Sequence, residues 1–108
     1  MIRSSLTPAQ NQLLHLIEEL AFGRIEQLSI HNGEPCYDPA PHIVQEIKLG
    51  SETERRPDQS NPDLTLKKEF LELFSALARL NDGVVVIEVR HGAPFRIIIE
   101  RRYTEFLP

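Results

Sequence analysis

The sequence predicts an α+β protein, with a mainly antiparallel sheet of about five strands and two helices on one face. Three observations lead to this class. Two segments repeat apolar residues at the spacing of an amphipathic helix. Each segment is followed by β-branched runs separated by a glycine turn. The turn phrase occurs twice, as "SIHNGEP" at residues 29–35 and "EVRHGAP" at residues 88–94, which predicts an internal α-β-β repeat.

The repeated phrase divides the chain into two helix-hairpin halves, residues 5–49 and residues 62–103. Residues 50–61 contain no apolar side chain, and we expect them to form a polar, solvated linker. A single helix with one hairpin is too small to bury its own apolar faces. We therefore expect the halves to share one core, so that residues 1–108 form a single domain.

Composition limits the classes of protein that fit the chain. Its 108 residues are 41% hydrophobic and 26% charged, which is typical of one globular domain. The net charge of −4 disfavours a protein whose affinity depends on neutralising phosphates. The single cysteine, Cys36, has no partner for an internal disulfide, so we expect a reducing compartment, the cytoplasm. The sequence has no signal-peptide core and no apolar run long enough to cross a membrane, so no membrane association is expected.

The first helix is expected in "SSLTPAQNQLLHLIEELAFG". Thr7 suits the N-cap and Pro8 the first helical position, where no N–H is needed. Gln10, three residues after Thr7, completes a capping box, and Gly23 is the expected stop. The apolar stripe of this helix consists of Leu13, Leu14, Leu16, Ile17, Leu20 and Ala21.

Three strands are expected in the remainder of the first half. "RIEQLSIHNGEPCYD" reads as a strand, a tight turn at Asn32-Gly33 and a short return strand. The prolines of "PAP", residues 39–41, interrupt the ladder because proline has no N–H to donate. "HIVQEIKLG" then forms a third strand, with one apolar face made by Ile43, Ile47 and Leu49.

The second helix is expected in "NPDLTLKKEFLELFSALARLNDG". Asn61 or Asp63 can cap it, Pro62 suits its first turn, and the segment 81–83 ends it. Its apolar stripe is wide and consists of Leu66, Phe70, Leu73, Phe74, Leu77 and Leu80.

The second hairpin, "VVVIEVRHGAPFRIIIERRY", has two β-branched runs around a turn at residues 91–93. Its core face consists of Val85, Ile87, Val89, Phe95, Ile97, Ile99 and Tyr103. Two registers keep this face intact, with Val89 opposite either Phe95 or Ile97. The second would set Arg90 opposite Arg96, a like-charge pair. We therefore predict the first, which pairs the side chains Glu88 with Arg96 and Val86 with Ile98.

This register leaves three β-branched residues, Val84, Val86 and Ile98, on the face turned away from the helices. A contiguous apolar patch of this kind marks an interaction site. We predict that it binds a protein partner, most simply a second copy of the chain in a homodimer. Its polar rim consists of Arg90, Arg96, Glu100 and Arg102.

One resemblance belongs to the first half. The segment "LLHLIEELAFGRIEQLSIHNG", residues 13–33, resembles a small uncharacterised bacterial family of helix-then-β-hairpin proteins. The shared features are an apolar helix running into Phe22-Gly23, a β-run and an Asn/Asp-Gly turn, and this chain has one extra residue in the strand. The resemblance implies a helix followed by a hairpin and assigns no site residue.

The sequence contains few candidate residues for catalysis or metal binding. His31 and His91 occupy the two matching turns and could lie close together, but no histidine pair has the spacing of a zinc site, so no metal is expected. We interpret His15 as a flank of the first helix and His42 as the start of a strand. Cys36 would need a neighbouring base to act as a nucleophile, and His31 is the nearest candidate. We expect a structural cysteine, no cofactor and no enzymatic activity.

The leading hypothesis is therefore a small non-enzymatic protein-interaction or adaptor module. The alternative is a nucleic-acid-binding accessory protein that uses the arginines of the second hairpin, Arg90, Arg96, Arg101 and Arg102. The entry helix is also similar to that of winged-helix DNA binders, but strands follow it directly where a recognition helix should come. Glutamates at 88, 100 and 105 offset most of the arginine charge, which favours the first hypothesis.

Overall fold

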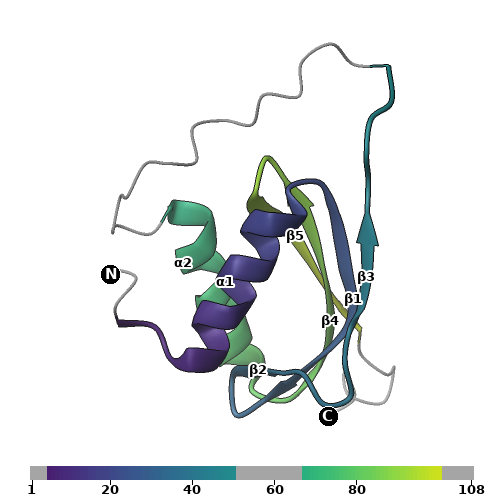
Figure 1. Cartoon of the computed structure of the whole chain (residues 1–108). Helices are drawn as coiled ribbons and strands as arrows, with labels where there is room; N and C mark the ends of the chain where they lie inside the picture. The colour runs from purple at the N-terminus through teal and green to yellow at the C-terminus, as the bar shows by residue number, and fades with distance from the viewer. Residues whose placement is uncertain (1–4, 51–66, 101–108) are drawn as a thin grey trace.

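The structure is a computed structural model, and it describes residues 5–50 and 67–100. It contains two helices and five strands, α1 (Pro8–Leu20), β1 (Gly23–His31), β2 (Glu34–Cys36), β3 (His42–Gln45), α2 (Lys68–Leu80), β4 (Gly83–Arg90) and β5 (Ala93–Glu100). All strand pairs are antiparallel, and both helices lie on the same face of the sheet (Figure 1). The predicted α+β class is confirmed.

Helix α1 begins as the sequence predicts. The Thr7 hydroxyl accepts a hydrogen bond from the backbone N–H of Gln10 at 3.1 Å, and the Gln10 side-chain oxygen accepts one from the N–H of Thr7 at 3.0 Å. This capping box satisfies two donors that the first turn leaves without an intrahelical partner. The helix ends earlier than expected: Ala21 is its C-cap, and Gly23 is the first residue of β1.

Helix α2 begins later than the predicted start near Pro62. Its N-cap is Lys67, which makes no side-chain capping bond. The predicted caps Asn61 and Asp63 lie outside the described residues, as do residues 51–61 of the expected linker. The apolar stripe of the described helix is buried as predicted, with Leu80 partly buried and Phe70, Leu73, Phe74 and Leu77 fully inside.

The sheet has the order β2-β1-β4-β5, and β3 also pairs with β1. Because β4 occupies one edge of β1, β2 and β3 share the other edge. Strand β2 pairs with the end of β1, where His31 faces Glu34, and β3 pairs with its beginning, where Gly23 faces Gln45. The prolines at 39–41 lie between these two strands, so the predicted interruption of the ladder is confirmed.

The third strand is shorter than predicted. It ends at Gln45, because its partner β1 begins at Gly23 directly opposite. Ile47 and Leu49 therefore lie beyond the strand, 71% and 86% exposed. Figure 1 shows this segment in teal, extending away from the sheet and the helices.

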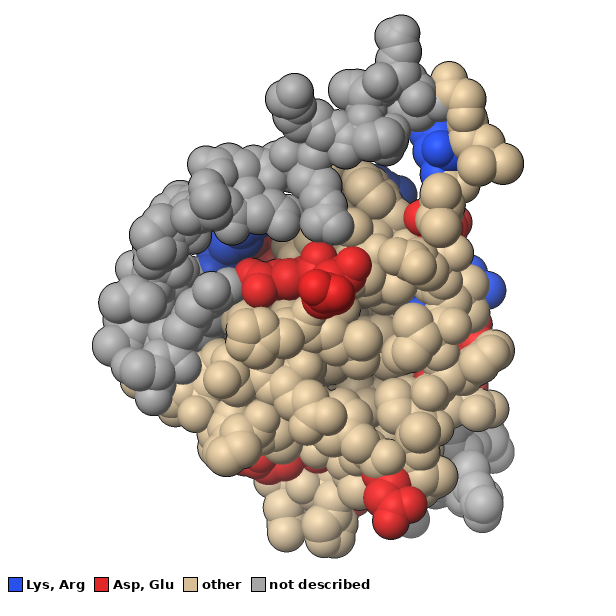
Figure 2. All heavy atoms as spheres, viewed as in Figure 1, with Lys and Arg blue, Asp and Glu red and all other residues tan. Residues whose placement is uncertain are grey.

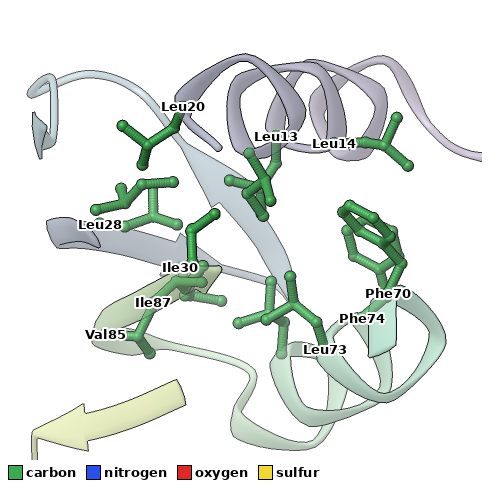
Figure 3. Packing of buried hydrophobic residues seen from close by; sticks show 14 residues of the cluster. Leu13, Leu14, Leu20, Leu28, Ile30, Phe70, Leu73, Phe74, Val85 and Ile87 are labelled. Atoms are coloured by element: carbon green, nitrogen blue, oxygen red, sulfur yellow. The ribbon is translucent and has the colours of Figure 1, made fainter. Parts of the chain in front are cut away.

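The core lies between the two helices and the two central strands (Figure 3). Both halves contribute to one cluster of buried side chains, namely Leu13, Leu14, Ile17, Leu20, Ile25, Leu28, Ile30, Phe70, Leu73, Phe74, Leu77, Val85, Ile87 and Val89. The predicted core face of β4 is therefore confirmed. Truncating one of these aliphatic side chains to alanine would cost about 2–5 kcal/mol.

The turn of each hairpin contacts the helix end of the other half. The N–H of Gly33 donates to the carbonyl of Asn81 at 2.8 Å, and the N–H of Gly92 donates to the carbonyl of Ala21 at 2.9 Å. Ala21 and Asn81 are the C-caps of α1 and α2, with positive φ values of 64° and 69°. Strand β1 contains one residue more than β4 between the pairs Ile25–Ile87 and Leu28–Val85. This bulge lies around Gln27, whose φ is 59°.

Candidate functional site

The register of the second hairpin decides which side chains form the predicted interaction patch. Glu88 faces Arg96 and Val86 faces Ile98, as predicted. The pairing of Val89 with Phe95 was wrong, because Val89 faces Pro94.

The cause of this difference is the length of the turn. Arg90 pairs with Ala93, so the turn consists of His91 and Gly92 alone, both at positive φ. Two-residue turns of this kind match the twist of the strands they join. From Arg96 onward, β5 pairs with β4 in the predicted register. The shorter turn therefore leaves Phe95 without a partner on β4, as the extra residue of a bulge.

Phe95 is consequently not a core residue, although it was predicted to be one. Its side chain is 42% exposed. The guanidinium of Arg90 lies 4.3 Å from the centre of its ring, and that of Arg96 lies 5.5 Å away. Both distances suit cation–π attraction. Two arginines of the predicted rim are therefore held over one aromatic ring.

Val84, Val86 and Ile98 lie on the face of the sheet opposite α1 and α2, and we call these three residues the outer patch. Their position follows from alternation, because the neighbouring residues of β4 are buried against the helices. Val86 and Ile98 face each other across the two strands, and Ile98 is 41% exposed. Glu100 faces Val84 at one end of the patch, whereas Arg102 lies outside the described residues.

A row of charged side chains that ends in a histidine borders the outer patch, and we call it the charge ladder. It crosses four strands and consists of His42, Glu26, Arg24, Glu88 and Arg96. Glu26 bonds to the side chains of Arg24 and His42, the latter at 3.1 Å, and Arg24 faces Glu88 across β1 and β4. Glu88 in turn pairs with Arg96 at 3.4 Å. The sequence analysis predicted only the Glu88–Arg96 pair. The opposite charges of Arg24 and Glu26, two residues apart in a strand, could have indicated the second pair.

The ladder is electrically balanced. The hydrogen bond from Arg24, and next the one from His42, lower the pKa of Glu26. The same bond to Glu26 raises the pKa of Arg24. These groups therefore stay charged and satisfied by each other at neutral pH. Two arginines against two glutamates leave little positive charge on this face for a phosphate backbone.

The histidines at the two turns are not brought together. His31 is the last residue of β1, at the end that pairs with the start of β4, whereas His91 follows the far end of β4. His31 lies 3.2 Å from an oxygen of Asp82, and the ring of His91 packs edge-on against Phe22 with 5.0 Å between centres. Within residues 5–50 and 67–100, no three His, Cys, Asp or Glu side chains form a group that could hold a metal ion.

Cys36, the candidate nucleophile, lies beside a backbone carbonyl and opposite a serine. The residue is half-buried at the end of β2, with its sulfur 3.4 Å from the backbone carbonyl of Asp38. Its partner across the sheet is Ser29, whereas His31 faces Glu34. In this register the residue directly opposite Cys36 is a serine, and His31, the candidate base, lies two residues farther along β1.

Sequence reasoning did not find one further feature, a hollow of about 130 Å³ between α2 and β5. It is open to solvent and has room for a small side chain or a few waters. Its lining combines acidic, basic and apolar groups, namely Glu69, Glu72, Leu73, Pro94, Phe95, Arg96 and Ile97. Elsewhere, Figure 2 shows a surface that is largely uncharged, with acidic side chains in small separate groups.

The chain matches no family model, and neither the curated proteins nor the solved structures contain a match to it. In the described part of the chain, neither helix has the length and apolar character needed to cross a membrane. The fold defines a small α+β protein in which both described helices cover the same side of the sheet.

Proposed function

We propose that this protein is a small non-enzymatic protein-interaction module that binds a protein partner through the outer patch. One observation carries the proposal: Val84, Val86 and Ile98 adjoin one another on the sheet face opposite the two described helices, and Ile98 is 41% exposed. Burying such a patch against a partner removes apolar area from water and stabilises the complex. The simplest partner is a second copy, because a two-fold axis lets one patch meet itself.

The surroundings of the patch favour a protein partner over nucleic acid. Arg96 is paired with Glu88, Arg24 with Glu26, and the guanidinium of Arg90 is over Phe95. An aliphatic centre beside compensated charges is the composition of a protein interface. A nucleic-acid site would instead leave its arginines available to phosphates.

The setting of this function is part of the same proposal. A cytoplasmic location suits a chain whose single cysteine has no second thiol to pair with. We also infer that the two helix-hairpin units are an internal repeat. The equal lengths of α1 and α2 support this inference, as do the two reciprocal contacts between hairpin turns and helix ends.

The test is the double variant Val86→Thr and Ile98→Lys, which places a charge and a hydroxyl in the patch. Sedimentation should show an association state one step lower than that of the natural sequence. The matched control is Gln12→Lys, which adds the same charge to an exposed position of α1 and should change nothing. The proposal fails if the double variant keeps both the association state and the co-purifying proteins of the natural sequence.

The nucleic-acid alternative is tested with the same samples. Binding to a short DNA or RNA duplex is measured by fluorescence at two salt concentrations. Tight binding that weakens steeply with salt would replace the proposed function with the alternative.

A further inference from the structure

The arm, residues 46–50, is the most exposed apolar segment of the described chain. It continues β3 past the first residue of β1, so the sheet gives it no neighbour on that side beyond Glu46. Ile47 and Leu49 are 71% and 86% exposed, against 42% or less for every other large hydrophobic residue described. Residues 49–50 form a turn, and apolar side chains gathered on one exposed segment mark an interaction site.

The backbone of the arm has an open edge. The N–H of Glu46 donates to the carbonyl of Phe22 at 2.9 Å, so the polar groups of Glu46 are turned toward β1. In an antiparallel ladder these groups alternate, and those of Gln45 and Ile47 therefore point away from β1. Within residues 5–50 and 67–100, β3 pairs with β1 alone. An edge of this kind is a template for another strand.

We propose that the arm pairs antiparallel with the arm of a second copy, with the two-fold axis at Ile47. The charges of the arm select this register. An axis at Glu46 would set two carboxylates opposite each other, and an axis at Lys48 would set two ammonium groups opposite each other. The axis at Ile47 sets Glu46 opposite Lys48 of the second copy, twice over, and like charges directly opposed are destabilising.

The same register covers the apolar face of the arm. Ile47 meets Ile47 of the second copy, and Leu49 lies in the turn at residues 49–50 that follows the paired segment. The outward backbone groups of Gln45 and Ile47 gain partners at the same time. Ile47, one of the two most exposed hydrophobic side chains of the described chain, is thus buried, and the unlike charges lie on the opposite side of the ribbon.

This contact goes beyond the proposed function, because it uses a surface that the outer patch does not share. A two-fold axis perpendicular to the sheet keeps both copies facing the same way. The outer patches of the two copies then lie on one side of the joined sheets, free to bind a partner. A substitution can therefore abolish the arm contact without affecting the patch contact, and the reverse also holds.

The first experiment is sedimentation of the full chain and of Ile47→Asp. The variant should be reduced by one association step with an unchanged circular dichroism spectrum, because the side chain is 71% exposed and takes no part in the core. The matched control is Ser75→Asp, which adds the same charge to an exposed position of α2. The variant Val86→Thr with Ile98→Lys should keep the arm contact, which separates this inference from the proposed function.

The second experiment tests the register by charge reversal. Glu46→Lys and Lys48→Glu should each weaken association about tenfold at low salt, because each turns two unlike pairs into two like pairs. The two reversals in one chain, or an equal mixture of the two single variants, restore unlike pairs and should return the affinity to within about twofold. The inference is overturned by a natural sequence that stays monomeric, by an Ile47→Asp variant that keeps the association state of the natural sequence, or by reversals that fail to compensate.

Discussion

The two helix-hairpin units use the same local devices but end in different structures. The first unit is α1, β1 and β2, and the second is α2, β4 and β5. Each helix has 13 residues and each hairpin turns on two residues of positive φ. Yet β2 has three residues whereas β5 has eight, and β3 is attached to the first unit alone. The regular second unit carries the outer patch, and the irregular first unit carries the arm.

The difference begins at the glycines that open the two central strands. A Cβ at Gly23 would lie 2.1 Å from the carbonyl oxygen of Val44, and the φ of Gly23 is 144°. A Cβ at Gly83 would meet only the side-chain tip of Leu80 at 3.2–3.4 Å, and the φ of Gly83 is not positive. The pairing of β3 with β1 therefore requires a glycine at residue 23. At residue 83, by contrast, neither the φ value nor a close backbone contact requires glycine.

The largest expected effect tests this asymmetry. Gly23→Ala should destabilise the protein by about 3 kcal/mol or more, since backbone strain and a clash with backbone add together. Gly83→Ala should stay within about 1 kcal/mol of the natural sequence, because a flexible leucine tip can move. Urea unfolding followed by circular dichroism measures both. Equal losses would show that the two glycines play the same part and that the attachment of β3 does not distinguish the units.

A smaller effect is expected at the hairpin turns. Gly33 and Gly92 have φ values of 79° and 72°, and both donate to the helix end of the other unit. A Cβ at Gly33 would lie 3.1 Å from the Cα of Ala78, whereas one at Gly92 would have 3.7 Å to the nearest atom, the carbonyl oxygen of Glu18.

Alanine at either turn adopts an unfavourable left-handed conformation, which costs about 1 kcal/mol or more. The crowding at Gly33 adds to that cost, so Gly33→Ala should lose about 2 kcal/mol and Gly92→Ala about 1 kcal/mol. Unfolding curves of the two variants side by side give the difference. A larger loss at Gly92 would contradict the close approach between the first hairpin and α2.

The features that local rules govern were predictable from the sequence. The capping box at Thr7 depends on two residues three apart, and the turn at Asn32-Gly33 depends on residues that tolerate positive φ. The buried stripes of both helices and the core face of β4 follow from periodicity alone. The outer patch was placed on the correct face for the same reason.

Of the two features that failed, one depends on a distant part of the chain and the other on the length of a turn. The end of β3 at Gln45 is set by where β1 begins, which no local pattern records. The bulge at Phe95 is set by a turn one residue shorter than expected, and that single residue moves Phe95 from the core to the surface. Pro94, which lacks an N–H, sits beside this bulge, where a ladder tolerates proline. The role of Arg90 changed with it, from a free rim charge to a cation over the ring of Phe95.

The smallest expected effect concerns two hydrogen bonds of the first unit that have no counterpart among the described residues of the second. The hydroxyl of Tyr37 donates to the backbone carbonyl of Ala9 at 2.8 Å, and the hydroxyl of Thr7 donates to a carboxylate oxygen of Glu34 at 2.8 Å. These bonds fasten the start of α1 to the end of the first hairpin. The N-cap of α2, Lys67, makes no comparable side-chain bond.

Burial, and next the charge of Glu34, raise the pKa of Tyr37. The folded protein therefore holds the phenol proton at pH values where the unfolded chain, with an ordinary tyrosine pKa of about 10, has released it. The unfolded state then binds fewer protons than the folded state, so stability falls as pH rises. The contribution is complete below a pH of about 10 and is lost progressively above it.

Tyr37→Phe should lose about 1 kcal/mol at neutral pH through the missing hydrogen bond. The variant should also show a shallower loss of stability above a pH of about 10, because its unfolded chain has one phenol fewer to ionise. Thr7→Ala is the control: it should lose about 1 kcal/mol through the missing cap and keep the alkaline slope of the natural sequence. Urea unfolding at a series of pH values from neutral to alkaline separates the two variants. An unchanged slope in Tyr37→Phe would mean that the phenol ionises equally well in the folded protein and that the tie between α1 and the first hairpin does not depend on its proton.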